Sequence, residues 1–340
     1  MRNVVKIFVN RGFTPIDNSV LKIGTSIDFD CYVQRFNGFF ILIKAGTFLD
    51  EARYKKIISR PLQIYMKTSE YDKYKKYKAK NTNKKHFLLE DMTLEEAQEK
   101  CLEVGKLFAL QSSVEEKLRT LYYLGKNLLG AYLNEKRNQK LPVKALEELV
   151  EMLALLVNEN RVTLSSFHNI IEDRYSLPTH LLNVTFFTAL IGSQIQIDLT
   201  DQKYLLMGAI LHDIGKSEID ESLLDKPDFL TKEEFDTIKM HSQKGIELAL
   251  KNGVKNRHII SAIKDHHERL DGSGYPFGLT SLRISQFGKI LAVCDVFDAL
   301  ITVKPYRGAY TTFNALKLIR EEFKNRLDLK YVNILIKLLK

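Results

Sequence analysis

The C-terminal part of the chain, from about residue 146 to residue 340, shows almost no alternation of apolar and polar residues. A strand with one buried face needs a two-residue alternation, whereas a helix packed on one face repeats its apolar residues every three to four positions. Helix starts of the form S/T-x-x-E appear before this part at Thr93 and Ser113, and Pro142 marks a further start. We therefore expect the C-terminal part to fold as an all-α helical bundle.

The first part of the chain has the pattern of a small sheet domain. The expected strands 29–36 and 39–44 flank Asn37-Gly38, a pair that tolerates the positive φ of a type I′ hairpin turn. A helix near 49–59 and a strand near 62–67 complete the predicted domain. Its sequence contains no recognisable catalytic constellation.

These patterns together predict an α+β chain of two domains. We expect a small N-terminal α/β-type sheet domain at 1–85, a helical linker region at 86–145, and an all-α helical bundle at 146–340. Our hypothesis for the sheet domain is a regulatory or partner-docking role, since it lacks catalytic residues. The helices of the linker region, at 93–138, suit either a relay or the interface of a homodimer, and the sequence does not choose between them.

The formal net charge of +9 raises the question of a polyanionic partner. The excess is local, because residues 53–85 hold twelve Lys or Arg and two acidic residues, and the rest of the chain sums to −1. Tyr71, Tyr74 and Tyr77 recur there at helical spacing, a pattern compatible with nucleic acid or an anionic membrane surface. We favour a solvated helix that packs its tyrosines inward, and we expect no nucleic-acid polymer as a partner.

Cysteine usage and the lengths of apolar runs favour a cytoplasmic protein. The three cysteines are far apart and share no metal-ligand spacing, so we interpret them as reduced thiols. The longest apolar stretches, such as 39–43, fall far short of the about 20 residues that span a bilayer. Residues 1–13 lack the apolar core of a signal peptide. We expect no transmembrane segment.

Five of the eight histidines combine with two aspartates into a candidate metal site. His212-Asp213 ends the apolar run 204–211, and Asp295 interrupts the apolar run 290–294, so polar groups enter buried surfaces where they are costly without partners. Neutral imidazoles and carboxylates suit first-row divalent metals, and this number of histidines exceeds what one metal needs. We expect two metals, with the ligands His180, His212, Asp213, His241, His266, His267 and Asp295.

Two further polar residues stand beside these candidates. Lys216 lies one helical turn after His212-Asp213 and on the same face, near any phosphate that the metals hold. Asp298 follows Asp295 by one turn. His86 and His258 have no comparable setting and are set aside, whereas His168 is ambiguous and is favoured as a capping or core residue over a ligand.

Several runs of this part resemble the HD-GYP family, the branch of metal-dependent HD phosphohydrolases that cleaves cyclic dinucleotides. The resemblance covers about 165–327. A lone His-Asp pair is a weak sign, but HHE followed by DGSGYP is highly specific. The matching pieces are His180, LHDIGK at 211–216, MHSQKG at 240–245, DHHERLDGSGYP from Asp265, and AVCDVFDAL at 292–300.

This resemblance implies a phosphodiesterase that hydrolyses cyclic di-GMP to pGpG, with slow further cleavage to GMP left open. It implies two Fe or Mn ions bridged by Asp213, with a hydroxide between them as the nucleophile. Lys216 would stabilise the developing phosphorane charge or protonate the leaving 3′ oxygen, so Lys216 and Asp213 are the implied catalytic residues. The other implied ligands are His180, His212 and Asp295 for one ion and His241, His266 and His267 for the second.

The resemblance also implies a set of substrate contacts. Lys304 stands where the family usually has Arg, which keeps the charge but loses the bidentate fork. The GYP triplet at 274–276 has three open interpretations: it shapes its loop, touches the substrate, or docks a partner such as a diguanylate cyclase. The implied substrate-binding residues are Gly274, Tyr275, Pro276, Asp298, Lys304 and Arg307.

One departure from the family concerns the number of metals. Members with a third metal carry a Glu four residues before the first histidine, where this chain has Ser176. We expect a dinuclear site, and with it inefficient cleavage of pGpG. Two alternative functions stay open: a signalling module that binds a cyclic dinucleotide or a partner protein with little hydrolysis, and a hydrolase of another nucleotide, such as mixed cyclic GMP-AMP.

Overall fold

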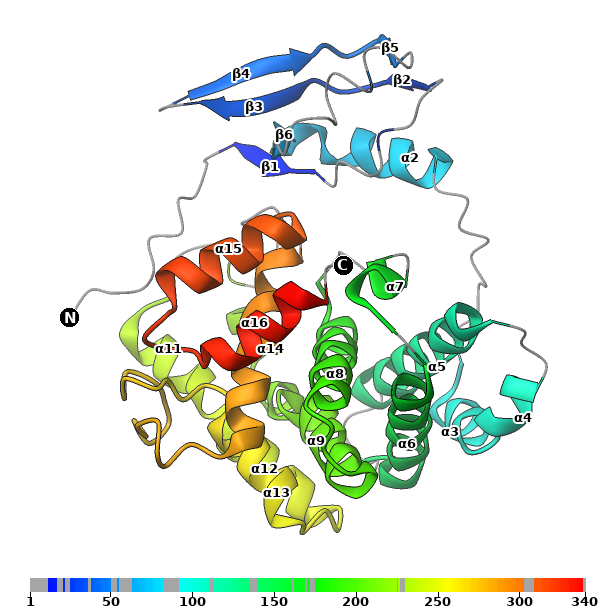
Figure 1. The fold of residues 1–340 in the computed structure, drawn as a ribbon, viewed down its shortest axis with the longest axis vertical. Coiled ribbons are helices and arrows are strands. Elements are labelled where there is room, and N and C mark those ends of the chain that lie inside the picture. Colours follow the sequence, from blue (N-terminus) through cyan, green and yellow to red (C-terminus); the bar gives the residue numbers. More distant parts are fainter. Residues whose placement is uncertain are drawn as a thin grey trace. The chain divides into compact units, whose positions relative to one another are not determined.

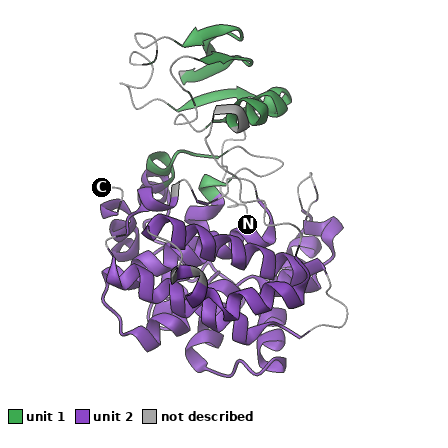
Figure 2. Ribbon diagram, turned by 90° about the vertical axis from the view of Figure 1, so that its right-hand side faces the viewer, with its two compact units in different colours: residues 1–88, 300–315 green, residues 89–299, 316–340 purple. Residues whose placement is uncertain are grey.

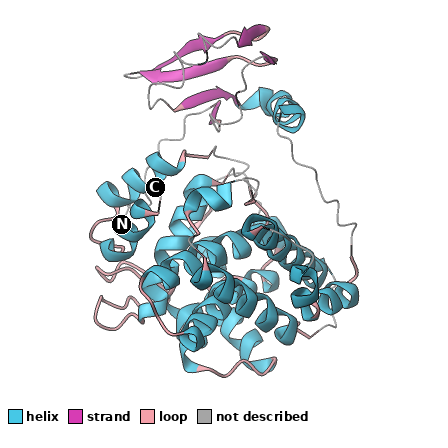
Figure 3. Ribbon diagram, turned by 45° about the vertical axis from the view of Figure 1, so that its right-hand side comes forward, coloured by secondary structure: helices cyan, strands magenta, loops and turns pink. Residues whose placement is uncertain are grey.

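The computed structural model of the chain separates into two compact units, one of residues 1–88 with 300–315 and one of residues 89–299 with 316–340 (Figure 2). The described residues are 12–16, 21, 25–35, 38–49, 54, 63–81, 92–109, 113–134, 140–160, 162–168, 170–171, 175–224, 226, 230–302 and 309–338. The predicted fold class, a small sheet domain followed by a helical bundle, is confirmed (Figure 3).

The first unit contains a four-stranded antiparallel sheet in the order β1-β6-β3-β4 and a separate pair, β2-β5 (Figure 1). The β3-β4 hairpin around Asn37-Gly38 is confirmed, since Arg35 pairs with Gly38. The helix predicted near 49–59 falls largely outside the described residues, and Leu49 ends a strand. The strands are β1 (Phe13–Pro15), β2 (Thr25–Ile27), β3 (Cys31–Arg35), β4 (Gly38–Ile43), β5 (Thr47–Leu49) and β6 (Ile64–Lys67).

The basic stretch forms η2 (Thr68–Glu70) and α2 (Tyr71–Asn81). Tyr74 and Tyr77 are buried, and their rings lie edge-on to Phe29 at centroid distances of 5.6 Å and 5.7 Å. Edge-to-face packing of this kind adds to the apolar area that the rings bury. The predicted inward packing of these tyrosines is confirmed, and the apolar face of α2 is therefore used by the core of its own unit.

Among the described residues of the second unit, the regular secondary structure is helical, apart from one isolated bridge between Asp271 and Thr280. Its first helices are α3 (Leu94–Leu102), α4 (Val104–Ala109), α5 (Val114–Asn134), α6 (Val143–Glu159), α7 (Leu164–His168), α8 (Leu177–Gln194) and α9 (Leu199–Leu211). There follow η3 (Ile214–Glu218), α10 (Glu221–Leu224), α11 (Lys232–Lys239), α12 (His241–Lys251), α13 (Arg257–Asp265), α14 (Gln286–Ile301), α15 (Thr312–Glu322) and α16 (Leu329–Lys337).

Helix α8 lies at the centre of the second unit. Every residue from 179 to 192 is buried, so this helix is enclosed on all sides and is apolar all round except at a few positions. Helices α5, α6, α9 and α16 pack against it. Because polar side chains on such a helix need partners inside the protein, His180 and Asn183 mark the place where the core turns polar.

The segment before the bundle begins with the predicted capping boxes. The Thr93 hydroxyl accepts from the Glu96 N–H while the Glu96 carboxylate accepts from the Thr93 N–H, and Ser113 and Glu116 do the same. Helices α3 and α5, which lie in the predicted linker region of 86–145, pack against α6, and α5 also packs against α8. The predicted boundaries at residues 85 and 145 stay a prediction.

The structure describes the surroundings of the three cysteines and the apolar character of the helices. All three cysteines are buried and unpaired, and burial raises the pKa of each thiol to about 12. Among the described residues, no helix has both the length and the apolar character that crossing a membrane requires.

Candidate metal centre

The seven predicted metal ligands come together from five segments of the second unit. His180 is in the first turns of α8, His212 and Asp213 follow α9, and His241 begins α12. His266 and His267 follow α13, and Asp295 is on α14. They form two groups whose possible ligand atoms lie within 4.8 Å of one another, Asp213 with His241, His266 and His267, and His180 with His212 and Asp295.

Asp213 lies between the two groups. Its Oδ2 is 3.2 Å from Nε2 of His180 and 3.5 Å from Nε2 of His212. Its Oδ1 is 3.0 Å from Nε2 of His241 and 3.6 Å from Nε2 of His266. One carboxylate therefore presents one oxygen to each group, the arrangement needed for a ligand shared by two cations.

Asp295 also reaches toward both groups. Its Oδ1 is 3.3 Å from Nε2 of His180, and its Oδ2 is 3.7 Å from Nδ1 of His267. Burial raises the pKa of Asp295, but the hydrogen bond from His180 and the neighbouring imidazoles hold that pKa well below its ordinary value. The side chain is consequently a carboxylate anion, which is the form in which an aspartate binds a metal ion.

Backbone carbonyls orient three of the histidine rings. In each case Nδ1 lies 2.7 Å from the carbonyl oxygen three residues earlier. A carbonyl only accepts, so Nδ1 must carry the proton, and Nε2 is left with a lone pair. The pairs are His212 with Ala209, His241 with Ile238, and His266 with Ile263.

Asp298 orients the fourth ring. Its Oδ2 lies 2.7 Å from Nδ1 of His180, and its Oδ1 accepts from Nδ2 of Asn183 at 2.8 Å. Asp298 is fully buried. The sequence interpretation as a substrate contact does not fit this position, because the carboxylate stands behind a ligand ring and not at an open surface.

The residues fit divalent cations. Nε2 atoms face each other at 3.3 Å between His180 and His212 and between His241 and His266. In the His241–His266 pair both Nδ1 atoms donate to carbonyls, so neither Nε2 of the neutral rings has a hydrogen to donate, and their lone pairs need a cation between or beside them. The buried Oδ1 of Asp213 has no hydrogen-bond partner among the described residues. Such an orphaned carboxylate oxygen costs free energy that a cation would offset.

Protonation in this cluster follows from burial and charge. Burial lowers the pKa of His212 to about 3 and also lowers the pKa of His266 and His267, so these rings are neutral at physiological pH. Burial lowers the pKa of His180 too, but hydrogen bonds to Asp213, Asp295 and Asp298 raise it well above its usual value. A cation on Nε2 takes the place of that proton.

Lys216 lies beside the Asp213 carboxylate, in line with its spacing of one helical turn. Its Nζ donates to Oδ2 of Asp213, and 17% of its side chain is exposed. Burial lowers the pKa of Lys216, but the Asp213 carboxylate raises it above the ordinary value. The ammonium in turn lowers the pKa of Asp213, against the effect of burial. Lys216 is therefore a cation next to the candidate centre.

A glycine lets the two halves of the site approach each other. A Cβ on Gly215 would lie 2.0 Å from the carbonyl oxygen of His241 and 2.4 Å from the amide nitrogen of Gly245. Both contacts are with backbone, which cannot rotate out of the way. The Gly in LHDIGK thus brings η3 against the first turn of α12, where His241 begins the helix.

Gly215→Ala is expected to destabilise the protein by about 3 kcal/mol, because the added methyl group forces backbone apart in a packed core. Chemical denaturation measures this. Gly130→Ala on α5 is the matched control: nothing lies within 4 Å of its Cβ position, so the helix should gain about 0.5–1 kcal/mol. Equal stabilities of the Gly215 variant and the wild type would contradict the close contact.

The DGSGYP loop folds back on the HHE segment. The buried carboxylate of Glu268 accepts from the N–H groups of Phe277 and Leu279, both at 2.8 Å. A Cβ on Gly274 would lie 2.4 Å from Cα of Glu268 and from the amide nitrogen of Arg269. Gly274 is accordingly a packing requirement of this loop, since any larger residue would collide with backbone.

The rest of the GYP triplet borders the centre. The Tyr275 ring lies 4.6 Å from the His267 ring and 6.3 Å from the His241 ring. Pro276 follows a cis peptide bond and is exposed. Lys304 and Arg307, the other predicted substrate contacts, lie outside the described residues.

Three residues with buried polar contacts had no assigned role in the sequence analysis: Tyr122 and Asn183, which bond to each other, and Glu268. Asn183 is three residues after His180 on one helix face, so its position beside the ligand could have been read from spacing. Glu268 is part of the HHE run, but its role requires knowing that the loop returns to it. Tyr122 precedes the matched family region and had no local signal.

Comparison with known proteins agrees with this geometry. Residues 165–330 match the HD domain family. The chain is 34% identical over 196 residues to the cyclic di-GMP phosphodiesterase response regulator RpfG of Xanthomonas campestris, covering 56% of this chain and 51% of the relative. It is 30% identical to the cyclic di-GMP phosphodiesterase PA4108 of Pseudomonas aeruginosa, covering 57% and 47%. The chain thus spans about half the length of these curated relatives.

Two further similarities widen this comparison. A 3′3′-cGAMP-specific phosphodiesterase 1 of Vibrio cholerae is 28% identical, with 73% of this chain and 58% of the relative covered. The solved structure of Bd1817, an HDG"Y"P protein from Bdellovibrio bacteriovorus, matches 96% of this chain and 99% of its own with a TM-score of 0.57 and 19% identity, which is a likeness of fold. Residues 165–330 thus form an HD domain whose HHE and GYP runs lie at one histidine-aspartate cluster, which supports the resemblance to the HD-GYP family.

Proposed function

We propose that this protein is a metal-dependent phosphodiesterase that hydrolyses cyclic di-GMP to pGpG at a dinuclear centre. The observation that carries the proposal is the position of Asp213, whose two oxygens face separate histidine groups. Asp213 would be shared by the ions. The other ligands would be His180, His212 and Asp295 for one ion and His241, His266 and His267 for the second.

The bound ions, a water molecule and Lys216 would carry out the remaining chemistry of the reaction. Two bound divalent cations supply a water of lowered pKa and neutralise charge on the phosphoryl oxygens. Water oxygen forms the new P–O bond and the bond from phosphorus to the 3′ oxygen breaks. Lys216, held protonated by Asp213, is placed to stabilise the charge that develops or to give a proton to the leaving 3′ oxygen.

The test is hydrolysis of cyclic di-GMP by the full chain reconstituted separately with Fe²⁺ and Mn²⁺, with product analysis. We expect linear pGpG as the main product. Because relatives are named both cyclic di-GMP and 3′3′-cGAMP phosphodiesterases, the same assay with 3′3′-cGAMP measures base preference. Metal-loaded protein that binds cyclic di-GMP without cleaving it would replace the proposal with the signalling-module alternative.

The number of metals is a prediction of its own. Ser176 caps α8: its hydroxyl accepts from the Thr179 N–H at 3.3 Å and lies 2.9 Å from Oγ1 of Thr179. Because serine at this position supplies no carboxylate for a third ion, we expect two ions per chain. Fe and Mn are the favoured metals. Elemental analysis of anaerobically purified protein measures the ratio. Three tightly bound ions in the wild type would contradict it, whereas Ser176→Glu is the variant in which a third ion is expected.

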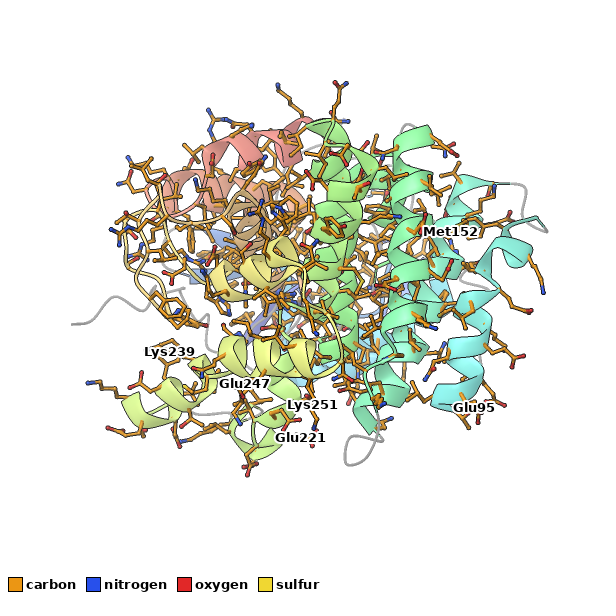
Figure 4. The ribbon with its side chains drawn as sticks, turned by 90° about the horizontal axis from the view of Figure 1, so that it is seen from below. Glu95, Met152, Glu221, Lys239, Glu247 and Lys251 are labelled. Atoms are coloured by element: carbon orange, nitrogen blue, oxygen red, sulfur yellow. The ribbon has the colours of Figure 1, made fainter. Side chains whose placement is uncertain are left out.

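Substrate contact by Tyr275 is part of the proposal. Phe235 on α11 is 40% exposed, and its ring lies 6.1 Å from the Tyr275 ring. Lys239, the last residue of α11 (labelled in Figure 4), has its Nζ 4.6 Å from the Phe235 centroid and 5.8 Å from the Tyr275 centroid. Two rings and a cation beside a metal centre suit a nucleobase and its phosphate.

The proposed roles of the other predicted contacts differ. Asp298 would hold His180 in place, and Gly274 would shape its loop. Docking of a diguanylate cyclase or other signalling protein on the GYP loop stays a prediction; Phe277, next in the chain, is 65% exposed and would take part in it. Contacts by Lys304 and Arg307, and a homodimer, also stay predictions.

A further inference from the structure

A line of buried side-chain hydrogen bonds runs from α5 to the candidate metal centre. The Tyr122 hydroxyl donates to Oδ1 of Asn183 at 2.7 Å. Asn183 Nδ2 donates to Oδ1 of Asp298 at 2.8 Å, and Oδ2 of Asp298 accepts from Nδ1 of His180 at 2.7 Å. The line therefore connects a helix that precedes the HD domain of 165–330 with a candidate ligand inside it.

All four side chains are almost completely buried. Water is thus a poor substitute for any of these bonds, and each donor must meet an acceptor inside the protein. If the Asn183 amide turned over, its NH₂ group would face the tyrosine and its oxygen would face the Asp298 carboxylate, placing two acceptors together. The Asp298 carboxylate therefore fixes the amide orientation in which Asn183 donates to it, and the Tyr122 hydroxyl holds the amide in place by donating to the Asn183 oxygen.

The packing of α5 on α8 determines where that hydroxyl lies. The Tyr122 ring lies edge-on to Phe186 of α8 at 5.5 Å. One turn further along α5, a Cβ on Gly125 would lie only 2.6 Å from Cδ2 of Leu182. This glycine lets the two helices come close, so the phenol reaches Asn183 directly.

We infer that Tyr122 is a positioning residue of the metal centre, acting on His180 through Asn183 and Asp298. This rests on the proposed dinuclear centre. The ring of His180 presents Nε2 to the centre only while Nδ1 stays bonded to Asp298, and partners of this kind strengthen metal binding. The helices before the HD domain are then part of what sets metal affinity, so a shift of α5 against α8 changes the centre.

The experiment measures Mn²⁺ affinity of the full chain by competition with a chelating dye. Loss of a carboxylate that bonds a ligand histidine costs about 10- to 100-fold in affinity, which is the expectation for Asp298→Asn. Tyr122→Phe removes one hydroxyl oxygen, which reaches that carboxylate only through Asn183. We therefore expect a smaller loss of affinity, of about three- to tenfold. Tyr132→Phe, also buried on α5, is the matched control and should bind Mn²⁺ like the wild type.

A double-mutant cycle separates positioning from a general effect on folding. If Tyr122 acts through Asp298, adding Tyr122→Phe to Asp298→Asn should cause no further loss of affinity. Additive losses, or wild-type affinity in Tyr122→Phe, would overturn the inference while leaving the proposed function intact. A wild-type chain that binds no Mn²⁺ would instead overturn the proposed centre itself.

Discussion

Replacing Asp213 with Asn is expected to lower the turnover of cyclic di-GMP by roughly 10³-fold or more. Loss of one preorganised charge-stabilising group in an active site already costs about 10²- to 10³-fold, and this substitution weakens both proposed ion sites together. The neutral amide keeps the size of the side chain but removes the charge that faces four histidines and Lys216. Initial rates at saturating Mn²⁺ measure the effect.

The control is a neighbouring aspartate with the same change in charge. Asp201 lies in the first turn of α9, the helix that Asp213 follows, and it is not part of either histidine group. Asp201→Asn should keep wild-type turnover. An Asp213→Asn protein that is fully loaded with metal and hydrolyses cyclic di-GMP at the wild-type rate would show that the proposed mechanism is wrong.

Removal of the metals is expected to abolish turnover and to lower the melting temperature by roughly 10 °C or more. A ligand at 100 times its Kd stabilises a folded protein by about 2.7 kcal/mol per site, and each kcal/mol corresponds to about 2–4 °C for a domain of this size. Without cations, Asp213 and Asp295 stay buried as anions among histidines, and part of their charge is uncompensated.

Differential scanning fluorimetry before and after EDTA treatment measures the shift, and added Mn²⁺ should restore both stability and activity. The Asp213→Asn variant provides an internal check, since a protein that holds little metal should change little with EDTA. A wild-type melting temperature that EDTA leaves unchanged would argue against a structural contribution of the ions.

Much of the architecture follows from short-range patterns. The hairpin at Asn37-Gly38 and the capping boxes at Thr93 and Ser113 depend on neighbours in the chain, and the structure contains them. Tyr74 and Tyr77 pack inward as their spacing indicated. Local geometry decides the hairpin and the capping boxes, because the groups that interact are at most a few residues apart, whereas the tyrosines meet Phe29 from a distant part of the chain.

The candidate centre shows where such reasoning stops. Residue type and order led to the seven predicted ligands, since imidazole and carboxylate inside apolar helices require partners, and the structure gathers these residues into two groups. Gly274 and Asp298 were predicted to contact the substrate; in the structure Gly274 lies against the backbone of Glu268, and Asp298 bonds to Nδ1 of His180. Both contacts join segments that are distant along the chain or folded back on themselves, and no spacing rule reports them.

The order of histidines and aspartates in the sequence is thus enough to predict a metal-dependent chemistry for this protein. Only the tertiary structure decides how these side chains are oriented. It determines which oxygen of Asp213 faces which histidine group and which carbonyl orients each ring, and it brings Tyr122 of α5 to Asn183 beside the centre. The physical reason is that ligand identity is a property of single side chains, whereas ligand orientation depends on close packing, as at Gly215, where a Cβ would collide with the backbone of α12.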